Sequence, residues 1–173
     1  MTAVRSDLGH PGLVEWLDEH DIKYEVIDGM LVVSPPPTVT HERIIIRVIA
    51  ALYAAAVPGT EVLASGVKSF YVGDFHVYPD VNVVRTSDAD LDDEGMRVPP
   101  LLVVEVLSPS TRRKDLLLKR EIYAEFGVPS YWLVDPKTRT LTVLSLRDGA
   151  YVETARGSRL ELEEPFPVVV DLT

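Results

Sequence analysis

One carboxylate stands in a run of apolar residues where a charge is out of place. Glu105 lies in the second half of the segment Leu101–Leu107, whose other residues are leucine and valine. A strand that is apolar on both faces is covered on both sides. Burying an ionised carboxylate there costs roughly several kcal/mol unless a partner or a cation compensates. Glu105 therefore needs a functional partner or a structural ion pair, unless the end of the strand already reaches solvent.

A lysine occupies a similar position in the helix predicted after this strand. The apolar stripe of that helix has members at steps of three or four residues, namely Leu116, Lys119, Tyr123 and Phe126. Because the helix directly follows the carboxyl end of the strand, its first turns can fold back over the sheet near Glu105. The ammonium of Lys119 could then meet that carboxylate or a bound anion. The alternative is that its stem is buried while the charged end reaches water.

Asp80 is a second acid at the start of an apolar run. It follows Pro79, and proline is tolerated at a strand start. One acidic loop separates this run from Glu105, which favours two neighbouring strands with both carboxylates in one cleft, although Asp80 could also cap the preceding loop. Such carboxylates repel each other unless a divalent cation lies between them, and magnesium prefers oxygen ligands. Without a metal, one carboxyl should keep its proton to a raised pKa.

The elements that must position these residues are a mixture of strands and helices. Strands are predicted near 23–27, 30–34, 61–65, 68–72, 80–85, 101–107, 131–134, 141–146 and 151–154. Helices are predicted around 13–17, from a cap at Thr38 or Thr40 to near Pro58, and from a cap within 108–111 to Phe126, ending at Gly127. This mixture predicts an α/β or α+β fold with one mixed central sheet, and a single domain over residues 1–173.

The composition excludes several functions. The chain has no cysteine, so disulfides, thiolate zinc sites, iron–sulfur clusters and cysteine nucleophiles are excluded. Its net charge of −10 excludes a broadly basic surface for nucleic acid, so any contact with a polyanion must be local or assisted by a metal. The sequence contains no apolar run of the ~20 residues that span a bilayer and no secretory signal pattern. We therefore expect a cytoplasmic protein without a membrane segment.

The three charged residues also carry a resemblance to known proteins. Pro79–Asp80, Glu105 and Lys119 resemble the PD-(D/E)XK nuclease superfamily, which implies a restriction-endonuclease-like fold. Two longer segments, 102–111 (LVVEVLSPST) and 127–136 (GVPSYWLVDP), are similar to the Uma-type family of proposed restriction endonucleases. Asp28–Gly29, the prolines at 35–37 and His41 fit the same family. The superfamily lysine expected two residues after the glutamate is Leu107 here, and the resemblance implies that Lys119 takes over its role.

The resemblance also implies a cofactor and its ligands. Asp80, Glu105 and the backbone carbonyl of Val106 would hold Mg²⁺ or Mn²⁺, and Lys119 would orient the attacking water or neutralise the transition state. The acid that such nucleases often carry on the first core helix would be Glu42, although Glu42 and the adjacent His41 could simply cap or flank the helix start. Basic residues at 112–114 would lie near the cleft, either in a solvated turn or in contact with phosphate.

The function implied is a magnesium-dependent endonuclease that hydrolyses phosphodiester bonds of nucleic acid, in particular DNA. The net charge of −10 favours a different class, a catalytically inactive binding or regulatory domain with the nuclease fold. A metal hydrolase for smaller phosphoesters is a third hypothesis. Because relatives of this fold often pair and a double-strand cut needs two active sites, we also expect a homodimer.

Overall fold

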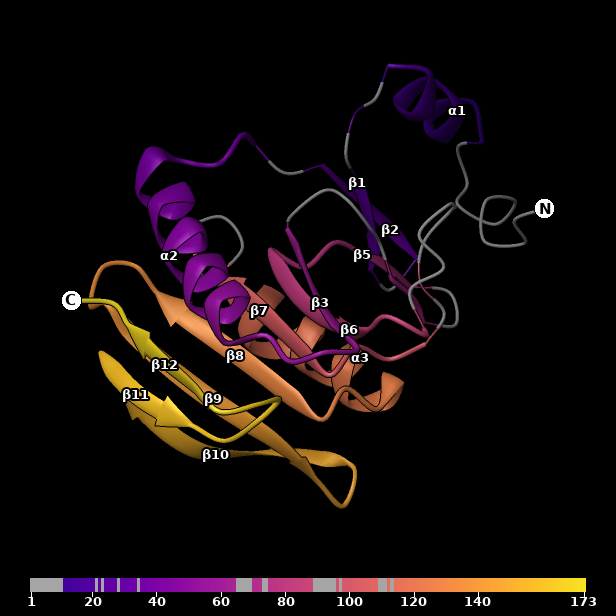
Figure 1. The fold of residues 1–173 in the computed structure, drawn as a ribbon. Coiled ribbons are helices and arrows are strands. Elements are labelled where there is room, and N and C mark those ends of the chain that lie inside the picture. The colour runs from indigo at the N-terminus through magenta and orange to yellow at the C-terminus, as the bar shows by residue number, and fades with distance from the viewer. Residues whose placement is uncertain are drawn as a thin grey trace.

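A mixed six-stranded sheet forms the centre of the computed structural model, which describes residues 11–20, 22, 24–27, 29–33, 35–64, 70–72, 75–88, 96, 98–108, 112 and 114–173. The strand order is β10–β9–β8–β7–β6–β3 (Figure 1). The strands are β3 (Thr60–Ala64), β6 (Val81–Arg85), β7 (Leu102–Val106), β8 (Ser130–Asp135), β9 (Thr140–Arg147) and β10 (Ala150–Gly157). Strands β7 and β8 are parallel and the other neighbours are antiparallel. The predicted mixed α/β fold is confirmed.

Further strands form two smaller sheets within the described residues. One is four-stranded in the order β2–β1–β5–β4 and the other pairs β11 with β12. Their strands are β1 (Tyr24–Ile27), β2 (Met30–Val33), β4 (Phe70–Val72), β5 (Phe75–Val77), β11 (Arg159–Leu162) and β12 (Val168–Asp171). The sequence patterns predict β1, β2 and β4 but not β5, β11 or β12.

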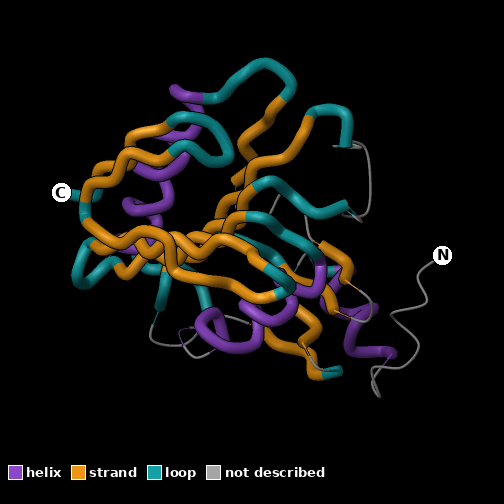
Figure 2. Tube along the Cα trace, turned by 90° about the horizontal axis from the view of Figure 1, so that it is seen from below, coloured by secondary structure: helices purple, strands orange, loops and turns teal. Residues whose placement is uncertain are grey.

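Helices cover both faces of the central sheet (Figures 1 and 2). Helix α2 (Val39–Ala55) packs on the face that includes Val104, together with the β11–β12 hairpin. Helix α3 (Lys119–Phe126) packs on the opposite face, which includes Val103. A further helix, α1 (Pro11–Glu19), packs against β1. Among the residues that the structure describes, no helix is both long and apolar enough to cross a membrane.

The ends of α2 and α3 follow from local sequence. Of the two predicted caps for α2, Thr38 is the one used, and its side chain accepts a hydrogen bond from the backbone N–H of His41. Helix α3 ends at Gly127, whose φ of 83° is the left-handed conformation that favours glycine. A π-helical turn, Lys114–Leu118, precedes α3 and was not predicted. Of the segment 108–111 expected to cap this helix, residues 109–111 lie outside the described residues.

Strand β7 is buried along its whole length, as its apolar sequence predicts. Its neighbour β8 contributes Tyr131 and Trp132, both fully buried, so these aromatic residues belong to the core. A charged residue in β7 is therefore enclosed by two packed layers. Because Glu105 is buried in this strand, its carboxylate must be stabilised by the side chains that contact it.

Candidate active site

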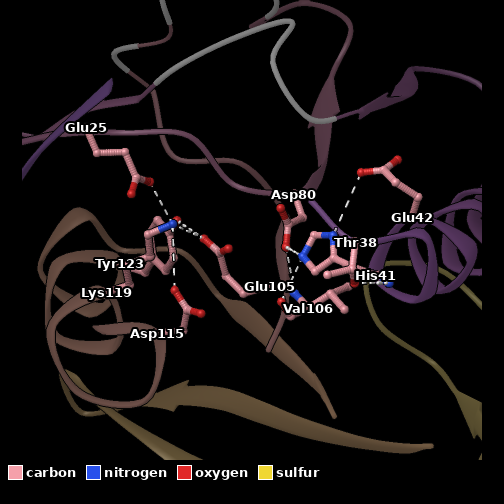
Figure 3. Close-up of polar contacts among 10 residues, drawn as sticks. All are labelled: Glu25, Thr38, His41, Glu42, Asp80, Glu105, Val106, Asp115, Lys119 and Tyr123. Carbon is pink, nitrogen blue, oxygen red and sulfur yellow. Dashed lines mark hydrogen bonds and ion pairs between the residues drawn. The ribbon is translucent and has the colours of Figure 1, made fainter. Parts of the chain in front are cut away.

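Two neighbouring antiparallel strands bring Asp80 and Glu105 together. Val81 in β6 pairs with Val104 in β7. Asp80 immediately precedes Val81 and Glu105 follows Val104, so the two acids lie at adjacent strand ends (Figure 3). The prediction that the two runs form neighbouring strands is confirmed. The carboxylates nevertheless make different contacts, because Glu105 contacts Lys119 whereas Asp80 contacts the backbone of Val106.

Lys119 reaches Glu105 from the first residue of α3. Its Nζ donates a hydrogen bond to Glu105 Oε1 over 2.7 Å, and the hydroxyl of Tyr123, one turn later, donates to the same oxygen over 2.7 Å. Lys119 and Glu105 are each 3% exposed. The prediction that the ammonium meets this carboxylate is therefore confirmed. The alternatives of a solvated lysine head and a solvated Glu105 are excluded.

Two further acids surround the same ammonium and were not identified from the sequence. Glu25 of β1 places Oε1 2.7 Å from Lys119 Nζ, and Asp115 Oδ1 lies 3.9 Å away. Both acids are buried. A signal was present for each: Glu25 is a charge within the buried segment Tyr24–Ile27, and Asp115 precedes Lys119 by four residues, one helical turn.

Burial and crowding change the proton affinities in this cluster. Burial raises the pKa of Glu105 to about 8, with Asp115, Asp80 and Glu25 adding to the shift and Lys119 opposing it. A raised pKa was expected for one of two adjacent carboxyl groups without a metal. The main cause here is burial of Glu105, and repulsion by the neighbouring acids is a smaller contribution. Burial also opposes the charge on Lys119, yet the carboxylates, Glu105 foremost, outweigh it and raise the pKa of Lys119 well above its usual value.

Asp80 belongs to a second group of contacts, shared with α2. Its Oδ2 accepts a hydrogen bond from the backbone N–H of Val106 over 2.8 Å. His41 Nε2 lies 3.3 Å from the same Oδ2 and 3.0 Å from the carbonyl oxygen of Val106. Burial disfavours a charged imidazole, but the hydrogen bond to Asp80, its charge and the Val106 carbonyl outweigh burial and raise the pKa of His41. His41 thus bridges the two oxygen atoms.

The remaining predicted residues lie at the edge of this group. Glu42 follows His41 in the first turn of α2; it is 47% exposed, and its Oε1 is 3.8 Å from His41 Nδ1. Among the basic residues at 112–114, Arg112 donates a 2.8 Å hydrogen bond to Asp135, so it forms an exposed ion pair. Arg113 lies outside the described residues.

Only two of the three groups expected to bind a metal lie close to one another. Asp80 Oδ2 and the carbonyl oxygen of Val106 both face His41 Nε2. The Glu105 carboxylate is turned towards Lys119 and Tyr123. Among the residues that the structure describes, no group of three or more histidines and acids is arranged to hold a metal ion. Two carboxylates and a carbonyl nonetheless fit a hard divalent cation by donor chemistry.

Comparisons with known proteins bear on the family and the fold of the chain. Residues 11–173 match the Uma2 family, described as "Putative restriction endonuclease". Among solved structures, the crystal structure of a putative nuclease from Anabaena variabilis ATCC 29413 is similar, with a TM-score of 0.69 and 18% sequence identity. The similarity covers 84% of this chain and 83% of that chain. At this identity, it shows a shared fold. The search of curated proteins gave no match.

Proposed function

Because the chain belongs to the Uma2 family of restriction-endonuclease-like proteins, we propose that it is a nuclease that hydrolyses phosphodiester bonds in DNA and requires Mg²⁺ or Mn²⁺. The observation that carries this proposal is the buried contact of Lys119 with Glu105, beside Asp80 on the neighbouring strand. An ammonium and two acids at adjacent strand ends supply the charges that phosphodiester hydrolysis needs, namely ligands for a cation and a fixed positive group.

The chain's own residues have separable roles in this proposal. Asp80, Glu105 and the Val106 carbonyl would hold the cation, which when bound supplies positive charge to the phosphate oxygens and activates a water. Lys119 stabilises the negative charge that develops in the transition state. The N–H of Val106 fixes the carboxylate of Asp80. His41 orients that carboxylate and the Val106 carbonyl from α2.

The proposal is tested by incubating supercoiled plasmid DNA with the purified protein and Mg²⁺ or Mn²⁺. We expect nicked or linear products that disappear with a chelator. Asp80→Asn and Glu105→Gln should each lower the rate by about 100-fold or more, the usual effect of removing a key electrostatic group. Glu121→Gln on the exposed side of α3 is a matched control with full activity. Cleavage retained by both site variants, each shown to be folded, would overturn the assignment.

A second function has a specific observation in its favour. Glu105 and Lys119 share a buried hydrogen bond, as they would in a purely structural contact, and the chain has a net charge of −10. A catalytically inactive domain that binds or regulates fits these facts. Calorimetric titration with Mg²⁺ separates the two functions: the nuclease should bind the cation and the inactive domain should not.

The substrate and the assembly belong to the same proposal. The comparison uses supercoiled plasmid, single-stranded DNA, RNA and nucleotides under equal conditions. It distinguishes a DNA nuclease from an RNA nuclease or a hydrolase of small phosphoesters.

A double-strand cut needs two active sites, so we propose that the enzyme acts as a homodimer. Sedimentation should then give twice the 19.2 kDa mass of one chain. A monomeric mass combined with nicked products alone would restrict the proposal to single-strand cleavage.

A further inference from the structure

Glu25 lies in the site although its strand belongs to a different sheet. Strand β1 is part of the four-stranded sheet, whereas Glu105 lies in the six-stranded sheet. The other residues of β1 are Tyr24, Val26 and Ile27, all buried and apolar in character. Glu25 itself is only 5% exposed. A buried acid in such a strand carries a large desolvation cost, so its contacts need a reason.

Glu25 gives the Lys119 ammonium a contact with a separate part of the fold. The ammonium already lies 2.7 Å from Glu105 Oε1, and Asp115 Oδ1 is 3.9 Å away. Glu105 lies in the central sheet and Asp115 in the turn before α3, whereas Glu25 lies in the four-stranded sheet. The contact with Glu25 therefore fixes the ammonium relative to a second sheet, which indicates a role in geometry.

Glu25 connects two parts of the site through one oxygen atom. Its Oε1 lies 2.7 Å from Lys119 Nζ and accepts a hydrogen bond from the backbone N–H of Tyr78 over 3.1 Å. Tyr78 precedes Asp80 by two residues. In Figure 3, Glu25 and Glu105 approach the ammonium from different sides. The carboxylate thus joins the lysine of α3 to the segment that leads into Asp80.

We propose that Glu25 is a positioning residue of the active site, which holds the Lys119 ammonium beside Glu105 and ties it to the segment that carries Asp80. This inference rests on the proposed nuclease function. Glu25 acts through Lys119, and its own contacts are with that ammonium and a backbone N–H. Without it, Lys119 loses one of the two 2.7 Å contacts that define its place.

The first measurement is independent of any catalytic activity. The ammonium group of Lys119 is buried and hydrogen-bonded, so its protons should exchange slowly enough to give a ¹H–¹⁵N signal, assigned by its loss in Lys119→Met. We expect this signal to shift or broaden in Glu25→Ala and to shift less in Glu25→Gln, whose amide oxygen can still accept from Lys119 and from Tyr78. Glu121→Ala, an exposed site on α3, should leave the signal unchanged.

The second measurement is plasmid cleavage by the same folded variants. Glu25→Ala should lower kcat by about 10- to 100-fold, the scale of a small misplacement of a reacting group, while KM changes by less than about twofold because DNA is not contacted. Glu25→Gln should recover most of this loss. A residue with a merely structural role would lower thermal stability and leave kcat of the folded protein unchanged.

The outcomes separate this inference from the proposed function. An active enzyme whose kcat is unaffected in Glu25→Ala overturns the inference and leaves the nuclease in place. A wild-type protein without nuclease activity overturns the function, and the ammonium signal then decides whether Glu25 positions Lys119. An unchanged signal in Glu25→Ala overturns that as well. If Glu25→Ala does not fold, Glu25→Asp, which draws the carboxylate back by one methylene, is the variant measured: a shifted ammonium signal with lowered kcat supports the inference, and an unchanged signal with wild-type kcat overturns it.

Discussion

At the scale of single residues, the site is governed by the burial of charges. Lys119 stays charged in the interior because acids from three elements, Glu25, Glu105 and Asp115, lie around it. The same burial favours the neutral form of Glu105, whose pKa rises to about 8. A cation bound beside Asp80 would favour the ionised form again. The proton on Glu105 and a metal ion are thus competitors for one carboxylate.

The raised pKa of Glu105 predicts how the free energy of unfolding depends on pH. Between the ordinary pKa of 4.5 and the folded value of about 8, the native protein holds a proton on Glu105 that the unfolded chain releases. The free energy of unfolding should therefore fall as pH rises through this range. His41, whose pKa is also raised, acts in the same direction because its protonated form stabilises the fold below its ordinary pKa of 6.5 and this contribution is lost as pH rises.

Urea unfolding at about pH 5 and about pH 8, without divalent cations, measures the effect. Glu105→Gln should remove most of the pH dependence, because glutamine does not titrate. Glu153→Gln at an exposed ion pair is the matched control and should keep the wild-type slope. A wild-type stability that increases over this interval would contradict the prediction.

At the scale of elements, the position of His41 and Glu42 depends on the packing of α2. These two residues lie in the first turn of the helix, which Thr38 caps. Val48 and Leu52 are fully buried against the central sheet, while the opposite side of the helix is exposed. Apolar packing along the whole helix thus fixes the end that contacts Asp80 and Val106. The local sequence determines where α2 begins, and its packing against the central sheet determines the direction of the helix axis.

Leu52→Ala should destabilise the protein by about 2–5 kcal/mol, because it leaves a cavity between α2 and the sheet. The adjacent residue provides the control: Tyr53 is 73% exposed, and Tyr53→Ala should change stability by no more than about 0.5 kcal/mol. Chemical denaturation of both variants gives the two values. Equal losses in the two variants would show that α2 does not pack as described.

At the scale of the whole molecule, an acidic protein is proposed to act on a polyanion. The net charge of −10 repels DNA at long range, and the proposed site is itself rich in acids. Local positive charge must then come from a bound divalent cation and from Lys119. Binding of DNA should depend on the cation, unlike that of a protein with a broad basic surface.

Fluorescence anisotropy of a labelled DNA duplex tests this dependence. With a chelator present, we expect no binding at about physiological ionic strength; with Ca²⁺ added as a probe cation, the anisotropy should rise. Asp80→Asn should abolish the cation-dependent rise, and Glu121→Gln should retain it. Binding of equal strength with and without the cation would show that DNA is recognised by another surface.

Local patterns in the sequence determined the strands of the central sheet, the helices and much of the site, although β5, β11, β12 and the π-helical turn were not predicted. The apolar run around Glu105, the stripe containing Lys119, the cap at Thr38 and the glycine after Phe126 are each readable within one element. Burial of a charge within such a run requires a partner, whatever the surrounding fold. This is why Glu105 and Lys119 stand out in the sequence alone.

Only the tertiary structure decided what completes the site. Glu25 comes from another sheet, His41 reaches Val106 and Asp80 from α2, and Tyr123 shares its acceptor with Lys119. Sequence periodicity reports which face of an element is buried, but not which other element covers it. Contacts between distant segments depend on how the sheets and helices pack, so a residue such as Glu25 gains its place only when the chain has folded.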